Sequence, residues 1–373
     1  DGIRDVERSR GLGDVYKRQT SDSAYDAINY ALSNAPDWSK IGVQLGSITL
    51  ESKLSISRGT IAIDFKGTYF SVDSTFPDSV VLEMKKDDDT EPWIESLHVY
   101  NLHIEGPGTG YAITGVVVRD QYNFEMKGFI IKNFDVGIQI DYVWQGWFED
   151  NRIFHTNTAV KSRYKATDTY WRNNYIYDAD KGMDLQDALG LEVTGCRIYN
   201  TTTNGIWIRT SDFFNISNCW FDGNGSYAIR IEKITDGTPS YAYIRGGRIK
   251  GNYIGEGPED WHYTQKGVYI KEYGQDSYYN DGIIISNNQF VVMHQDAIYL
   301  VDCKGISIIG NTFKYSSYGS AGTYSDVHIE SSADYKSMRM TIADNISFGN
   351  NYPLAFVRIE NYPAYNIVIS SNL

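Results

Sequence analysis

The segment 204–212, NGIWIRTSD, alternates apolar and polar side chains. Ile206 and Ile208 alternate with Trp207 and Arg209, which is the period of a β-strand with one buried face. Eight other segments place an apolar residue at the position of Ile206: Ile138, Val160, Met183, Ile229, Val268, Ile298, Val327 and Val357. Successive positions are 22, 23, 23, 23, 39, 30, 29 and 30 residues apart. A short strand repeated at this period predicts an all-β solenoid, in which each repeat is one coil and equivalent strands stack in parallel.

The long step of 39 residues marks an insertion. We place it at about residues 233–266 and expect a loop, because extra residues in solenoids go to loops, often on a working face.

A second repeated segment precedes each strand and carries a polar position. Asparagine holds that position in most coils, and cysteine or glycine replaces it in the middle of the chain: Asn151, Asn174, Cys196, Cys219, Gly247, Asn288, Asn311 and Asn372. Asparagine tolerates the left-handed conformation of a sharp corner, and stacked amides can bond to each other. The equal spacing favours this structural role over surface ligands. We expect Cys196 and Cys219 to be small buried thiols, although a disulfide is conceivable at one coil's separation.

Composition and the absence of certain motifs argue against several classes of function. The formal net charge is −13, which argues against a nucleic-acid partner. No apolar run approaches the roughly 18 residues of a membrane span. Metal-ligand spacing of His and Cys, a Gly-rich phosphate loop and a serine nucleophile motif do not occur, so we predict neither a metal nor a cofactor.

The chain divides into three parts. Residues 1–19 lack apolar periodicity and resemble translated sequencing-adapter read-through, with a disordered arm as the alternative. Residues 20–93 contain a short capping helix, SDSAYDAINYALSNAP at 21–36, and the first coils. Residues 94–373 are the repeats, which we expect to be truncated at the C-terminus.

The repeats, the helix and the segment GSITLESKLSISRGTIAIDFKG at 46–67 resemble the right-handed, single-stranded parallel β-helix of the pectate-lyase-like superfamily. The likeness is greatest to the branch with bacteriophage tailspike and tail-fibre proteins, and it covers about residues 20–373. It implies a right-handed parallel β-helix, action on polysaccharide, and a homotrimer in an extracellular or virion setting. The architecture itself serves lyases, hydrolases, epimerases and adhesins.

The outward positions of the repeated strand form a candidate glycan surface. Aromatic rings suit the apolar faces of sugars, and basic groups could meet acidic groups on a glycan. The predicted binding residues are Trp207, Tyr269, Tyr299, Lys161, Arg163, Arg209 and Arg230. The alternative is that rings and ion pairs, such as Asp184 with Arg209 or Arg230 with Glu232, cover the sheet or a subunit interface.

Glycoside hydrolysis needs two carboxylates flanking the scissile bond. Asp184 and Glu232 lie two coils apart, about 10 Å at the backbone, within reach of the roughly 6.5–9.5 Å separation of an inverting pair. Asp187 and Asp212 are substitutes. We therefore predict an extracellular or virion-associated polysaccharide-binding protein that cuts glycosidic bonds by inverting hydrolysis. A non-catalytic tail-fibre protein or adhesin, and a polysaccharide lyase acting on uronates, remain the alternatives.

Overall fold

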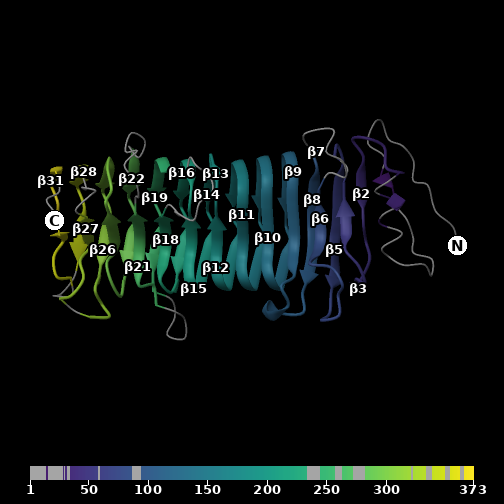
Figure 1. The fold of residues 1–373 in the computed structure, drawn as a ribbon, viewed down its shortest axis with the longest axis horizontal. Coiled ribbons are helices and arrows are strands. Elements are labelled where there is room, and N and C mark those ends of the chain that lie inside the picture. The colour runs from purple at the N-terminus through teal and green to yellow at the C-terminus, as the bar shows by residue number, and fades with distance from the viewer. Residues whose placement is uncertain are drawn as a thin grey trace. The chain divides into compact units, whose positions relative to one another are not determined.

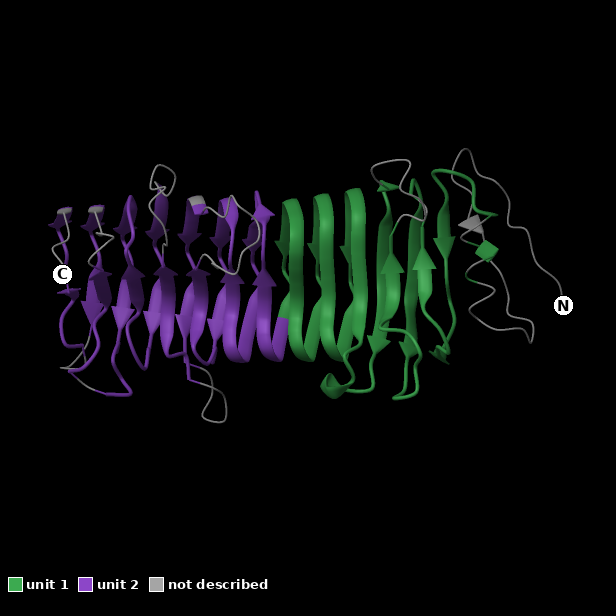
Figure 2. Ribbon diagram, viewed as in Figure 1, with its two compact units in different colours: residues 1–175 green, residues 176–373 purple. Residues whose placement is uncertain are grey.

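The structure is a computed structural model. It describes residues 14–15, 28, 30–31, 34–57, 59–85, 94–232, 244–256, 263–271, 282–320, 322–332, 338–348, 353–361 and 365–373. The chain forms two compact units, residues 1–175 and 176–373 (Figure 2). Within each unit, strands pair in parallel with their equivalents in the next coil (Figure 1).

Unit 1 contains the first coils. Its strands are β1 (Asp14–Val15), β2 (Lys40–Gly42), β3 (Ser47–Thr49), β4 (Leu54–Ile56), β5 (Ala62–Ser71), β6 (Val80–Met84), β7 (Ile94–Glu95), β8 (His98–Glu105), β9 (Thr114–Lys127), β10 (Ile130–Glu149) and β11 (Arg152–Arg172), with a short 3-10 helix at Thr109–Tyr111. β10 and β11 pair in parallel along their length, from the pair Ile130–Arg152 to the pair Glu149–Arg172.

Unit 2 begins within β12 (Tyr175–Leu185), which is followed by the short β13 (Ala188–Leu189). Its remaining strands form three columns. The first column is β14 (Glu192–Thr194), β16 (Ser211–Ser217), β19 (Ile244–Lys250), β22 (Ile283–Ser286), β25 (Ile306–Ile309), β28 (Met338–Ala343) and β31 (Tyr365–Ser370).

The second column starts with the beginning of β15 (Arg197–Ile208) and continues through β17 (Trp220–Asp222), β20 (Tyr253–Gly255), β23 (Gln289–Val291), β26 (Thr312–Lys314) and β29 (Ile346–Phe348). The third starts with the end of β15 and continues through β18 (Tyr227–Glu232), β21 (Lys266–Lys271), β24 (Ile298–Val301), β27 (Val327–Ser331) and β30 (Val357–Asn361).

The register of the third column confirms the predicted repeat. Its inward row is Ile206, Ile229, Val268, Ile298, Val327 and Val357, each paired with the next. Ile206 and Ile208 are fully buried. In unit 1, Ile138 pairs with Val160 as predicted. The interior of each unit is therefore a stack of like side chains, as a solenoid requires.

The corner between the first and second columns carries the predicted asparagine ladder, with two corrections. Asn252, not Gly247, holds the position in its coil, because the Asn252 Oδ1 atom accepts a hydrogen bond from the Cys219 backbone N–H (2.9 Å). Gly247 lies in β19 opposite Phe214. Asn345 is a further member of the ladder and joins Asn311 to Asn372.

The left-handed residue at this corner is the one before the ladder position. It is asparagine, aspartate, glycine or, once, serine: Asp150, Asn173, Gly195, Asn218, Gly251, Asn287, Gly310, Asp344 and Ser371. The ladder asparagines instead stabilise the corner through their amides. Asn288, for example, donates to the Ile249 carbonyl (2.9 Å) and accepts from the backbone and side chain of Asn252.

The cysteines are free and buried, which confirms the thiol prediction for Cys196 and Cys219. Burial, together with the neighbouring Cys196 thiol, raises the pKa of Cys219.

Three predicted segments, the helix 21–36, residues 1–19 and the loop 233–266, are only partly covered by the described residues. Within the expected helix 21–36, Ile28, Tyr30, Ala31 and Asn34 are helical, Ala35 and Pro36 are not, and the other residues lie outside the described part of the chain. Of residues 1–19 only Asp14–Val15 is described, as a strand paired with β2. The expected loop 233–266 is wrong for residues 244–256, which form β19 and β20. No helix among the described residues is long and apolar enough to cross a membrane.

Candidate functional site

The outward row of the third column is a continuous line of large polar and aromatic side chains. In register it is Trp207, Arg230, Tyr269, Tyr299, His328 and Arg358, and we call this row the strip. Parallel in-register pairing brings neighbouring members about 4.8 Å apart at the backbone. The predicted residues Trp207, Arg230, Tyr269 and Tyr299 thus lie side by side in unit 2.

Trp207 contacts two guanidinium groups. The Cζ atom of Arg209 lies 3.9 Å from the indole ring and that of Arg230 lies 4.2 Å from it. Such contacts are attractive because the ring face carries negative potential. The indole Nε1 atom is buried and has no hydrogen-bond partner in the described part of the chain.

The two predicted catalytic carboxylates hold these arginines in place. Asp184, 6% exposed, accepts from Arg209 Nε and Nη2, both at 2.6 Å. Glu232, 9% exposed, accepts from Arg230 Nε at 2.7 Å. A bidentate pair fixes the planar guanidinium. Little carboxylate surface is left to meet a glycosidic bond, so this geometry favours positioning of the arginines over catalysis.

The aromatic members of the strip pack against each other. The Tyr299 ring stacks on His328 at 4.5 Å and lies 5.5 Å from Tyr269. Tyr269 is only 8% exposed, so the expectation that it offers an open ring to a sugar is wrong. Tyr299 donates to Glu330, and burial together with this carboxylate raises the pKa of the Tyr299 phenol.

The remaining predicted residues do not join the strip. Asp187 lies in a left-handed turn between β12 and β13. Asp212 lies in β16, in the first column, opposite Arg245. Lys161 and Arg163 belong to β11 of unit 1, where Arg163 is the extra residue of a register shift and its backbone N–H donates to Asp141 (3.2 Å).

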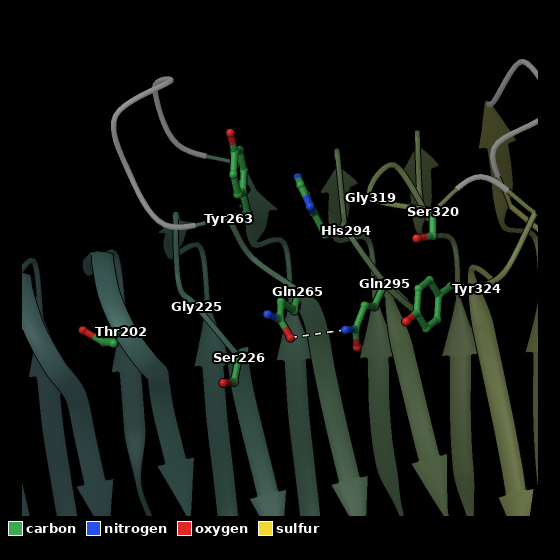
Figure 3. Close-up of a pocket in the computed structure, with 10 residues that line it drawn as sticks. All are labelled: Thr202, Gly225, Ser226, Tyr263, Gln265, His294, Gln295, Gly319, Ser320 and Tyr324. Carbon is green, nitrogen blue, oxygen red and sulfur yellow. Dashed lines mark hydrogen bonds between the residues drawn. The ribbon is translucent and has the colours of Figure 1, made fainter.

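A cavity of about 460 Å³ opens at the corner between the second and third columns of unit 2 (Figure 3). Its described lining consists of hydroxyl, amide and aromatic side chains and two Gly-Ser pairs: Thr202, Gly225, Ser226, Tyr263, Gln265, His294, Gln295, Gly319, Ser320 and Tyr324. Pockets that hold small ligands fall in the range of about 300–1,000 Å³. Sequence reasoning missed this cavity, because its residues come from the turns between strands, which the period of the strands does not align.

The wall of the cavity is ordered by direct contacts. The Tyr263 ring stacks on His294 at 4.2 Å, and Gln295 Nε2 donates to Gln265 Oε1 (3.2 Å). Figure 3 shows Tyr263 and His294 projecting above the two glutamines. Gly319 lies so close that a Cβ atom there would be 2.8 Å from His294 Nδ1.

Lys266 joins the cavity to the third column. Its Nζ atom donates to Gln295, which lines the cavity, and lies 5.4 Å from the Tyr227 ring and 5.8 Å from the Tyr299 ring. Burial lowers the pKa of this ammonium group.

Two further carboxylates lie close to each other, and one of them, Glu256, is near the cavity residue His294. Asp222 ends β17 and pairs with Gly255, so Glu256 is one residue further along in the next coil. Glu256 Oε1 lies 3.7 Å from Nε2 of His294. Burial, and then the negative charge of Glu256, raises the pKa of Asp222 although Trp220 Nε1 donates to it (3.3 Å). Two nearby carboxyls with different environments suit an acid and a base.

Among the described residues, no group of three or more His, Cys, Asp or Glu side chains could hold a metal ion.

Comparison with known proteins addresses the fold. The family model described as "Right handed beta helix region" matches residues 95–257. The chain is a right-handed parallel β-helix. A search of the curated proteins finds no relative of this sequence.

Several solved structures share this β-helix at low sequence identity. The catalytic unit of a thermostable α-1,3-glucanase from Streptomyces thermodiastaticus is 13% identical with a TM-score of 0.63, over 94% of this chain and 65% of the glucanase chain. The A-module of a mannuronan C-5 epimerase from Azotobacter vinelandii is 14% identical with a TM-score of 0.59, over 94% and 93% of the two chains. The tailspike protein of E. coli bacteriophage HK620 is 12% identical with a TM-score of 0.56, over 92% and 74%. At these identities the likeness shows the fold alone.

Proposed function

We propose that this β-helix is an extracellular or virion-associated protein that binds a polysaccharide on unit 2 and hydrolyses its glycosidic bonds. The observation that carries the proposal is the surface formed by the strip and the cavity. Aromatic faces beside polar groups match sugars, which have both apolar ring faces and hydroxyl groups. The similar glucanase and epimerase structures support a polysaccharide ligand, and the similar bacteriophage tailspike supports a virion setting. We further propose a homotrimer, which the resemblance to tailspike proteins implies.

For the chemistry we assign Asp222 as the general acid and Glu256 as the general base. Asp222 gives its proton to the glycosidic oxygen as the bond from that oxygen to the anomeric carbon breaks. A water molecule adds its oxygen to the anomeric carbon, and its proton passes to Glu256. The raised pKa of Asp222 supports the acid role, because the group must be protonated when the leaving oxygen departs.

The second candidate function is a non-catalytic adhesin or structural fibre. The observation that favours it is the pairing of Asp184 with Arg209 and of Glu232 with Arg230, which turns the predicted catalytic pair into part of a binding or packing surface. The lyase alternative needs cations that are free to neutralise a uronate, and both of these arginines already have a carboxylate partner.

The test is incubation with a broad panel of bacterial surface polysaccharides, followed by assays for binding, for new reducing ends and for unsaturated uronate. We expect reducing ends that Asp222→Asn and Glu256→Gln each lower at least about a hundredfold, with binding retained. Asp344→Asn, at an exposed corner, is the matched control. Binding without product would establish the adhesin, and unsaturated product the lyase. The absence of any binding would exclude the proposal.

A further inference from the structure

The charges on the glycan surface of unit 2 compensate each other. Arg209 is paired with Asp184, Arg230 with Glu232, and Arg358 with Glu360. An arginine whose donors already point at a carboxylate offers little to a second anion. The whole chain also carries a net charge of −13, which repels a polyanion at long range. The expectation that these arginines meet acidic sugars therefore loses its physical basis.

The described lining of the cavity also favours an uncharged ligand. Among the described residues that line it, none is Asp, Glu, Lys or Arg. The amides of Gln265 and Gln295 both donate and accept, as sugar hydroxyls do, and the hydroxyls of Ser226 and Ser320 can do the same. Tyr263, exposed to 46%, presents a ring for the apolar face of a sugar.

The cavity lies at the start of the strands that carry the strip. Ser226 lines the cavity and directly precedes β18, and Arg230 of the strip is four residues further along the chain. At a rise of about 3.3 Å per residue, the separation along the strand is roughly 13 Å. A single glycan chain can therefore place one sugar in the cavity and others against Trp207.

We propose that the ligand is an uncharged polysaccharide and that the cavity is the subsite that reads its hydroxyl groups, with Tyr263 as its stacking platform. This inference rests on the proposed function and adds the class of substrate and the residues that select it.

The experiment is calorimetry of the full chain with neutral probes (soluble α- and β-glucans, galactomannan) and acidic probes (polygalacturonate, alginate). Each titration is run at about 0.02 M and 0.3 M salt, because screening weakens charge-driven binding. We expect a neutral probe to bind with an affinity that changes less than about twofold between the two salts. We expect Tyr263→Ala to weaken this binding about tenfold, which corresponds to about 1.4 kcal/mol. Tyr111→Ala in unit 1, whose side chain is similarly exposed at 48%, is the matched control and should leave it unchanged.

The outcomes separate the inference from the proposed function. Preferred binding of acidic probes that salt abolishes would overturn the inference and leave polysaccharide binding intact. So would binding of a neutral probe that Trp207→Leu weakens and Tyr263→Ala does not, since the cavity would then take no part. Failure of every probe and of the bacterial panel to bind would overturn both.

Discussion

The indole ring of Trp207 contacts the guanidinium groups of Arg209 and Arg230, whose Cζ atoms lie 3.9 and 4.2 Å from the ring centre. Arg209 belongs to the same strand as Trp207, and Arg230 is its in-register neighbour in the next coil. One ring is therefore positioned by contacts within a coil and between coils. A flat, fixed aromatic surface loses little conformational entropy when a sugar packs against it.

Replacing this ring should weaken glycan binding. We expect Trp207→Leu to reduce affinity about tenfold, that is by about 1.4 kcal/mol, because the apolar platform and the order of both arginines are lost. Calorimetry with the best-binding glycan measures the effect. Phe348→Leu, at an exposed aromatic residue of β29, is the control. Equal affinities of Trp207→Leu and the unmodified protein would show that the strip is not the binding surface.

The ion pair between Asp184 and Arg209 should contribute mainly to stability. In Asp184→Asn the Arg209 guanidinium, whose side chain is 19% exposed, loses its charged partner. We expect the free energy of unfolding to fall by about 2–3 kcal/mol, measured by urea denaturation.

A double variant separates pairing from catalysis. Asp184→Leu combined with Arg209→Met removes both charges and should recover much of the lost stability. Loss of hydrolysis in a fully stable Asp184→Asn protein would instead restore Asp184 as a catalytic residue.

The fold was predictable because its signal repeats. The step between Ile206, Ile229 and Val268 identifies equivalent strands even where one step is long, and parallel stacking then follows. The position of Gly247 was assigned wrongly because "GGRI" resembles "TGCRI" in letters. The segment GNYI at 251–254, which matches NNYI at 173–176, contains the ladder residue Asn252, and the amide hydrogen bonds of Asn252 establish its place.

The site was less predictable for a physical reason. Alternation correctly placed Trp207 and Arg230 outward, but it does not report whether an outward side chain is covered, as Tyr269 is. Alternation also does not report ion pairs, and the ion pairs of Asp184 and Glu232 favour a positioning role for these two carboxylates. The cavity around His294 depends on how turns of different lengths pack together, and no single period describes these turns.

The asparagine ladder should be a main source of stability in unit 2. Asn288→Ala removes the acceptor for the buried backbone N–H of Asn252 and the donor to the Ile249 carbonyl. Since buried polar groups without partners are costly, we expect a loss of about 2–4 kcal/mol in the free energy of unfolding. Asn157→Ala, at an exposed position of unit 1, should cost far less in the same denaturation experiment. Similar losses in the two variants would contradict the role of the ladder.

Asp326 should make stability depend on pH. This side chain is 1% exposed, its Oδ2 atom accepts from Ser347 Oγ (2.5 Å), and burial raises its pKa above the ordinary value of 3.8. The folded state therefore holds this proton more tightly than the unfolded state. Its contribution to stability is fully present below about pH 3.8 and is lost as the pH rises through the folded-state pKa.

Asp326→Asn removes this dependence. We expect the variant to gain stability relative to the unmodified protein as the pH increases from about 4 to about 7, because the amide carries no charge that must be buried. Urea denaturation at several pH values measures the difference in the free energy of unfolding. Asp344→Asn controls for the removal of one negative charge at an exposed corner. A difference between Asp326→Asn and the unmodified protein that stays constant, or shrinks as the pH rises, would show that Asp326 is not the buried acid responsible.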